Sequence, residues 1–144
     1  MAQSSVAPSS TPAARAARPA RRRMEQGRKR LLLASAMGLV GSFLPWLLTG
    51  VGNVNGARGA GLYVAYAAVL GLAGALMPMR RVASVQGFVL ASAAVVLPLW
   101  QLVHIWSLVG FAGWTPGPGL VMCLGAGVLA GIGSLQLWHR PAEA

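Results

Sequence analysis

The polar residues best suited to chemistry lie near the end of one long apolar segment. Gln101, His104 and Ser107 are spaced by three residues, which predicts neighbouring positions on a helix, and Trp114 follows shortly after them. An imidazole in this place could bind a ligand, carry a proton or coordinate haem. A membrane span needs only about 20 residues, so His104 would fall at the edge of the bilayer, where it needs no function. Both interpretations of this candidate outer-face polar site stay open.

Other reactive groups are scarce. The sequence contains no Asp, and its two acids, Glu25 and Glu143, are expected in solvent. Carboxylate pairs, a Ser-His-Asp set and the intramembrane charges of ion-coupled transporters are therefore missing. Haem ligation by two histidines is disfavoured because His139 would lie at the opposite membrane face from His104. A single cysteine, Cys123, excludes an internal disulfide, and no metal-ligand spacing is present. We predict a non-enzymatic protein with no cofactor and no metal.

The elements that would position these residues are long apolar segments. Of 144 residues, 56% are hydrophobic and 10% are charged, whereas soluble domains devote about 25% to charge. The hydrocarbon core offers no water to an unpaired backbone, so each span must be helical. We predict an all-α fold, a four-transmembrane-helix bundle within residues 31–140. The expected spans are at about residues 31–50, 61–79, 82–109 and 119–138.

The ends of the chain are polar. Residues 1–30 are rich in Ala, Ser, Pro and Arg, which predicts a disordered cationic cytoplasmic tail, and residues 141–144 form a short cytoplasmic C-terminus. A cleaved secretory signal is disfavoured because the first apolar segment exceeds the usual 7 to 15 residues. The tail lacks aromatic residues for base stacking, so we expect anionic lipid, and no specific nucleic acid, as its partner. The residues expected to contact anionic lipid are Arg21, Arg22, Arg23, Arg28, Lys29, Arg30, Arg80 and Arg81.

The distribution of cations predicts the orientation. Every Lys and Arg except Arg58 lies in the N-terminal tail, in the connection at residues 80–81, or at the C-terminus. Cytoplasmic loops carry the excess of Lys and Arg. We therefore predict a multi-pass protein with both termini cytoplasmic and Arg58 outside. Aromatic residues such as Trp46 and Trp106 fall near the expected outer ends, where amphipathic rings collect.

The two halves of the apolar region resemble each other. Residues 69–81, "VLGLAGALMPMRR", align without a gap on residues 128–140, "VLAGIGSLQLWHR". We interpret this as a tandem repeat of two helical hairpins, related by an axis along the membrane normal. Chance similarity among Leu, Gly and Ala is the alternative.

Two prolines occupy matching places in this alignment. "FLPW" at residues 43–46 lies over "VLPLW" at residues 96–100, which pairs Pro45 with Pro98. Proline is tolerated in a membrane helix when another group satisfies the freed carbonyl, which for Pro45 is that of Gly41. We predict helix kinks at both prolines.

Small residues recur every four positions in two segments. Helices in lipid associate by close packing, which small side chains permit. We expect these residues to face the bundle interior or another subunit. The two stripes are Ala67, Gly71 and Ala75 in the second segment, and Cys123, Gly127 and Gly131 in the fourth.

Several of these features occur together. "SFLPW" at residues 42–46, a Gly-rich connection after it, an Ala- and Gly-rich second segment and an Arg-rich tail resemble small, uncharacterised four-helix integral membrane proteins of high-GC actinobacteria. The resemblance implies a bacterial plasma-membrane location and no reaction to carry over. We expect an accessory or scaffold protein that associates with another membrane protein or with itself. The alternatives are a small oligomeric transport or pore-type protein for an uncharged or lipophilic solute, and a membrane sensor using the outer-face site.

Overall fold

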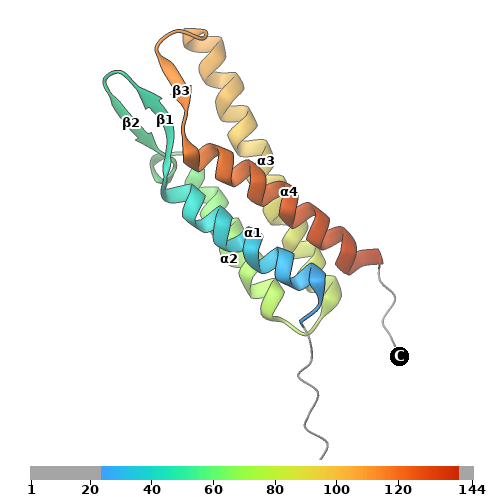
Figure 1. The fold of residues 1–144 in the computed structure, drawn as a ribbon. Helices are drawn as coiled ribbons and strands as arrows, with labels where there is room; N and C mark the ends of the chain where they lie inside the picture. The colour runs from blue at the N-terminus through green and yellow to red at the C-terminus, as the bar shows by residue number, and fades with distance from the viewer. Residues whose placement is uncertain (1–23, 140–144) are drawn as a thin grey trace, which may run out of the picture.

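The computed structural model describes residues 24–139, and this part of the chain is mostly helical (Figure 1). Four helices and three short strands follow one another, as the sequence analysis expected for the helices but not for the strands. In chain order the elements are α1 (Gln26–Phe43), β1 (Pro45–Thr49), β2 (Gly52–Asn55), the 3₁₀ helix η1 (Gly56–Arg58), α2 (Gly61–Leu76), α3 (Arg80–Val109), β3 (Trp114–Pro116) and α4 (Pro118–His139).

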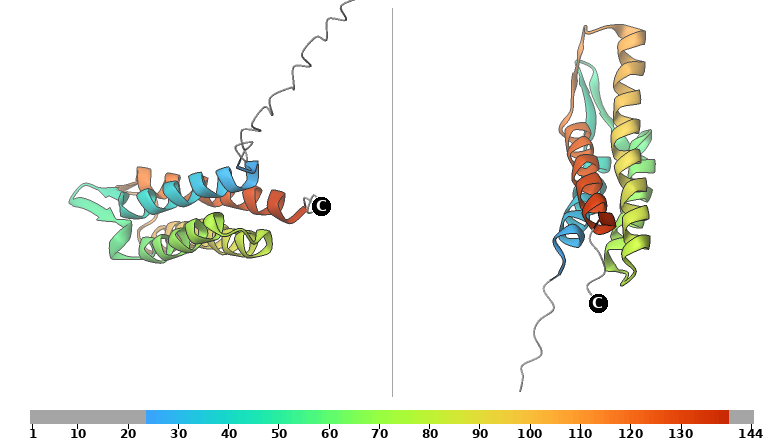
Figure 2. Two further views of the ribbon diagram at one scale, coloured as in Figure 1. Left: turned by 90° about the horizontal axis from the view of Figure 1, so that it is seen from below. Right: turned by 90° about the vertical axis from the view of Figure 1, so that its right-hand side faces the viewer.

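The four helices form a closed ring. α1 and α3 each pack against both α2 and α4, so that α1 and α3 lie diagonally opposite each other. Figure 2 shows the result as two layers, α1 beside α4 and α2 beside α3. Leu31, Val64, Leu90 and Leu120, one from each helix, are at most 1% exposed and fill the centre. Burial of these branched side chains closes the interior of the bundle.

The three strands form one antiparallel sheet in the order β2–β1–β3. Leu48 of β1 lies opposite Asn53 of β2 on one side and Thr115 of β3 on the other. The sheet extends beyond the end of the bundle where α1 finishes and α4 begins (Figure 1). We call this the sheet end. The opposite end, where α1 and α3 begin with their cations, is the charged end.

The SFLPW segment does not form a kinked helix. α1 ends at Phe43, Leu44 is extended with φ −73° and ψ 161°, and Pro45 begins β1. The predicted first span to residue 50 and the predicted kink at Pro45 are therefore wrong. The residue before a proline is biased toward extended backbone, and here that bias ends the helix. Trp46, expected at the membrane interface, is instead 2% exposed, and its indole donates a hydrogen bond to the carbonyl of Gly41.

Glycines from later segments surround this turn. The backbone N–H of Gly56 donates to the carbonyl of Leu44 at 3.2 Å, and that of Gly117 donates to the carbonyl of Trp46 at 2.7 Å. A Cβ atom on Gly56 would overlap the Trp46 indole, and one on Gly117 would overlap the carbonyl oxygen of Pro45. Only glycine permits backbone to approach backbone this closely. The turn thus brings together the end of α1, the start of η1 and the connection from β3 to α4.

The second proline differs from the first. Pro98 is buried inside α3, which continues without interruption to Val109. Because Pro45 starts a strand and Pro98 lies within a helix, the two are not structural counterparts. The tandem repeat inferred from residues 69–81 and 128–140 stays a prediction, and the proline pair no longer supports it.

The other helix boundaries lie near the predicted spans. α2 ends at Leu76, before the proline of "MPM", and α3 and α4 each begin and end within two residues of the prediction. α1 begins at Gln26, so residues 26–30 are helical and do not belong to the predicted disordered tail. Residues 1–23 and 140–144, with Arg21, Arg22 and Arg23, lie outside the described residues.

Length and composition distinguish the helices. α3, with 30 residues, and α4, with 22, are long and apolar enough to cross a membrane. α2 is apolar but has 16 residues. α1 carries Arg28, Lys29 and Arg30 within its first five residues, so its apolar part begins only at Leu31.

Candidate functional site

The four residues of the predicted polar site do not converge. Gln101 is half-buried and lines a cavity between α3 and the β1–β2 hairpin, together with Trp46 and Arg58. His104 is exposed and stacks on Trp100, with ring centroids 5.3 Å apart and planes inclined by 8°. Three residues of helix turn by about 300°, so each step of three rotates the side chain about 60° away from the previous one. The spacing therefore points Gln101 and His104 in different directions.

The other two members make local contacts. The exposed hydroxyl of Ser107 donates to the carbonyl of His104 at 2.7 Å, within the same helix. The indole N–H of Trp114 donates to the carbonyl of Gly110 at 2.8 Å, within the connection that leads to β3. Trp114 lines a different depression from the Gln101 cavity. These contacts hold the backbone in place and create no acid–base pair.

The Gln101 cavity is too small for an organic ligand. Its volume is about 140 Å³, whereas small-molecule pockets are usually about 300–1,000 Å³. Its polar groups come from Asn55, Arg58 and Gln101, and Trp46 forms an apolar wall. A space of this size and polarity suits a few ordered waters under the hairpin. The arrangement supports the sheet and offers no site for a substrate.

A larger depression lies at the end of α3. It has a volume of about 530 Å³ and is open, lined by residues of β1 and of the connection to β3, including Leu48, Phe111 and Trp114. The rings of Phe111 and Trp106 lie beside each other, with centroids 4.8 Å apart and planes inclined by 44°. Gly110 and Gly113 have φ angles of +64° and +83°, which only glycine adopts readily, and they bring the aromatics back toward the sheet.

Sequence reasoning missed this depression. Residues 110–114 read "GFAGW", two aromatics each preceded by glycine. The signal was present, since glycines that require positive φ turn the chain sharply and fix the direction of the neighbouring aromatic side chains.

No constellation for metal or acid–base chemistry is present in residues 24–139. No group of three or more His, Cys, Asp or Glu side chains there could hold a metal ion. Cys123 is buried, with its sulfur 4.0 Å from the carbonyl oxygen of Gly38. Glu25, which the sequence placed in solvent, is 15% exposed and forms an ion pair with Arg80 at 3.4 Å. The start of α1 packs beside the start of α3, so the carboxylate is drawn to the cation.

Comparison with known proteins gives no relative: no family model, no curated protein and no solved structure matches this chain.

The cations expected at the lipid surface have different environments. The Arg28 guanidinium donates to the carbonyls of Ala75, Met77 and Pro78, so it caps the end of α2. This is the charge that the C-terminal end of a helix favours. Lys29 and Arg81 are exposed, Arg30 is half-buried, and Arg80 contacts Glu25.

The small-residue stripes lie against neighbouring helices. A Cβ atom on Gly71 would come within 2.8 Å of Leu90 in α3, and one on Gly127 would come within 2.6 Å of Val95. Both glycines thus lie against α3, because α2 and α4, diagonally opposite each other, each pack between α1 and α3. Of the six residues, five are buried (Ala67, Gly71, Ala75, Cys123 and Gly127), and Gly131 is half-buried.

Proposed function

We propose that this chain is a multi-pass protein of a bacterial plasma membrane whose four helices all cross the bilayer. Two helices, α3 and α4, meet the length and composition of a span by themselves. α1 and α2 pack side by side with them around a common core, so a bilayer that contains α3 and α4 must also surround α1 and α2. Apolar side chains on their outward faces support this, among them Leu33 and Val40 of α1 and Val69 of α2, each at least 51% exposed.

The proposed orientation has the charged end in the cytoplasm. The first residues of α1 and α3 lie together at that end, with Lys29, Arg30 and Arg81 among them. The sheet end has one cation, Arg58. Since the excess of Lys and Arg stays in the cytoplasm, the sheet and both Trp-containing connections lie outside.

We further propose that the protein is a non-enzymatic accessory or scaffold protein, which binds another membrane protein at the sheet end. The observation that carries this proposal is the projecting end of α3. With 30 residues at about 1.5 Å each, α3 is about 45 Å long, and the hydrocarbon core is about 30 Å thick. The last part of α3 stands beyond the other helices, beside the sheet (Figures 1 and 2).

This projecting end has an apolar surface that no residue between 24 and 139 covers. We call it the α3 tip, and its exposed members, each at least 54% exposed, are Trp100, Val103, Trp106, Leu108, Val109 and Phe111. A contiguous apolar patch in an aqueous or interfacial region is typical of a protein interaction site. Aromatic residues are also enriched where interfaces are strongest.

The depression beside the α3 tip adds a place for an anchoring side chain. Among its lining residues, Leu48 and Trp114 belong to the sheet, and Phe111 belongs to the connection between α3 and β3. A volume of about 530 Å³ accepts one large side chain of a partner, and hot spots of interfaces commonly fill such pockets. The partner we propose is therefore a membrane protein with an apolar, aromatic-rich surface just outside the bilayer.

The packed interior argues against a pore within a single chain. The central side chains Leu31, Leu90 and Leu120 are at most 1% exposed. Backbone contacts at the small residues close the space between neighbouring helices. A pathway for solute would require an assembly of several chains.

Site-specific photo-crosslinking tests the proposal. A photoreactive residue at Val103 or Leu108 should give a discrete adduct with one partner in intact cells. The same residue at Asn53, which is exposed on β2 but polar in its surroundings, is the matched control and should give none. Loss of the adduct in a Trp106→Ala variant would show that the partner binds at the α3 tip. Equal labelling at all three positions, or adducts with lipid alone, would contradict a scaffold role.

A further inference from the structure

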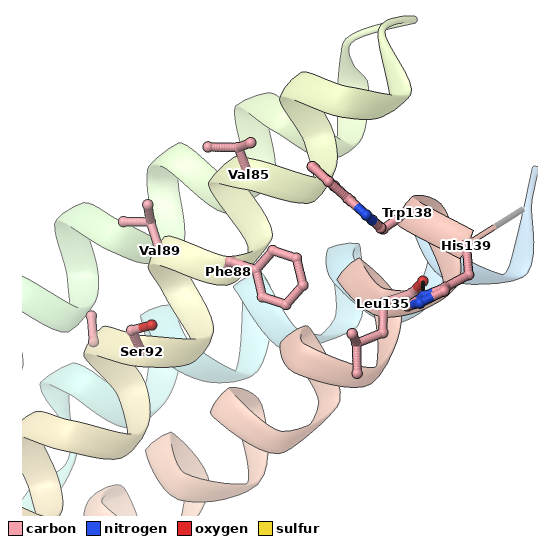
Figure 3. Close-up of a pocket in the computed structure, with 8 residues that line it drawn as sticks. Val85, Phe88, Val89, Ser92, Leu135, Trp138 and His139 are labelled. Atoms are coloured by element: carbon pink, nitrogen blue, oxygen red, sulfur yellow. Dashed lines mark hydrogen bonds between the residues drawn. The ribbon is translucent and has the colours of Figure 1, made fainter.

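A second surface feature lies in the charged half of the bundle, between α3 and α4. It is an apolar groove of about 790 Å³, lined by residues from Val85 to Ala93 of α3 and from Leu135 to His139 of α4. Figure 3 shows Phe88 of α3 and Trp138 of α4 on facing helices along it. Its size is within the usual range for ligand pockets, about 300–1,000 Å³.

The groove follows from the sizes of the side chains along the two helices. The backbones come close where the hydroxyl of Ser84 donates to the carbonyl of Ser134 at 2.8 Å. Further along α3 the lining includes the small residues Ser92 and Ala93 together with the larger Phe88, and Leu135 of α4 contributes to it as well. The depression is therefore built into the packing of α3 against α4 and does not depend on a flexible loop.

The length and charge of the groove suit one kind of occupant. Arg81 is exposed and lies one helical turn before Val85, on the same face of α3. From Arg81 to Ala93 the helix rises by about 18 Å, close to the thickness of one leaflet, which is half of about 30 Å. A partner helix would need a groove along the whole bilayer. The length of the groove therefore fits the acyl chain of a lipid, with the lipid headgroup at one end.

The headgroup end of the groove is cationic. Glu25 is the one acidic residue between residues 24 and 139, and it is paired with Arg80. No second carboxylate is present in the described part to pair with the exposed cation Arg81, and Trp138 and His139 lie at the same end. Tryptophan collects at the depth of lipid headgroups, and anionic lipid is attracted to cations in the cytoplasmic leaflet.

We propose that this groove binds the acyl chain of one anionic phospholipid of the cytoplasmic leaflet, with the headgroup at Arg81, Trp138 and His139. The inference rests on the proposed membrane location and orientation, and it adds a lipid site that differs from the α3 tip.

The test is native mass spectrometry of the full chain in mild detergent, with phosphatidylglycerol and phosphatidylcholine of identical acyl chains as probes. The wild type should retain about fivefold more phosphatidylglycerol, the effect of one surface cation. Arg81→Gln should remove this preference, and Ser92→Phe should fill the groove and reduce the binding of both lipids. Val69→Phe, on the exposed face of α2 at 53% exposure, is the matched control and should change neither.

Several outcomes would overturn the lipid site. These are equal retention of both lipids by the wild type, unchanged binding in Ser92→Phe, or an equal loss in Val69→Phe. Thermal unfolding of each variant in the same detergent separates loss of the site from loss of the fold. Extraction of the protein from membranes by alkaline carbonate would contradict the membrane proposal itself, whereas a membrane-integral protein without lipid preference contradicts only this inference.

Discussion

The indole N–H of Trp46 donates a hydrogen bond to the carbonyl oxygen of Gly41 at 3.0 Å, from the first strand back to the last turn of the first helix. α1 ends at Phe43, so the carbonyls of its last turn have no partner in a following turn. Trp46 satisfies one of them while it fills the space under the sheet at 2% exposure. One side chain thus caps the end of the helix and anchors the sheet.

Replacement of Trp46 by Phe should destabilise the protein. Phenylalanine keeps most of the ring but leaves the buried Gly41 carbonyl without a donor, which costs about 1–3 kcal/mol. Trp106→Phe is the control, because Trp106 is 54% exposed and makes no such bond. The measurement is the thermal unfolding midpoint in detergent. Equal midpoints for the two variants would mean that the bond to Gly41 contributes nothing.

Replacement of Gly117 by Ala should be more damaging than the same change at Gly50. The added Cβ at Gly117 would overlap the carbonyl oxygen of Pro45, whereas nothing lies within 4 Å of the corresponding position at Gly50. Overpacking of this kind costs about 1–3 kcal/mol. Limited proteolysis of the sheet end should therefore be faster for Gly117→Ala and unchanged for Gly50→Ala. A variant at Gly117 as resistant as the wild type would refute the close approach.

Replacement of Ser84 by Ala should loosen the contact between α3 and α4. The variant loses the hydrogen bond from Ser84 to the carbonyl of Ser134, 2.8 Å long and buried. Such interhelical bonds contribute about 0.6 kcal/mol on average in membrane proteins, and at most about 1.7 kcal/mol. Ser107→Ala, which removes a bond on the exposed surface within one helix, should leave the unfolding midpoint unchanged. A larger effect at Ser107 than at Ser84 would reverse this assignment.

Replacement of Arg28 by Gln should destabilise the charged end, whereas Lys29→Gln should not. Arg28 bonds to the carbonyls of Ala75, Met77 and Pro78, and Lys29 is exposed. Loss of a cation at a helix C-terminus costs about 0.3–1 kcal/mol. Hydrogen exchange of the last turn of α2 is the measurement, and the rates should rise only in the Arg28 variant. Equal rates in both variants would show that the cap is not needed.

Reporter fusions test the proposed orientation directly. Fusions at residues 58 and 114 should report an outside location, and fusions at residues 80 and 144 a cytoplasmic one. The expectation follows from the excess of Lys and Arg on one side. A single reporter with the opposite location would contradict this orientation, and the α3 tip would then lie in the cytoplasm.

The sequence predicted three of the four helices well because their apolar runs are bounded by clear breakers. Pro78 follows α2, and Pro118 begins α4. The first helix was extended too far because Pro45 was interpreted as a tolerated membrane proline. Its apolar neighbours Leu47 and Leu48 fit a helix as well as a strand, and short apolar runs do not distinguish the two. Whether these residues form a helix or a strand depends on Gly117, whose N–H donates to the carbonyl of Trp46. Gly117 is distant in the sequence, so no local pattern predicts this contact.

The candidate site was predicted less well than the fold. Spacing by three indicated that Gln101 and His104 share a face, but side chains three residues apart on a helix differ in direction by about 60°, and the hairpin covers only Gln101. The α3 tip was missed because exposure of Trp106 and Leu108 depends on where α3 ends relative to its neighbours. That relation is a property of the assembled bundle.

The strand order β2–β1–β3 has a consequence for synthesis in the cell. β2 is made directly after β1, but β3 follows only after both intervening helices, at Trp114. During translation one edge of β1 therefore stays unpaired until β3 has been made, just before α4. In the proposed orientation, a chain arrested before that point would present a bare strand to extracytoplasmic proteases, so the closed sheet would distinguish a finished molecule from an incomplete one.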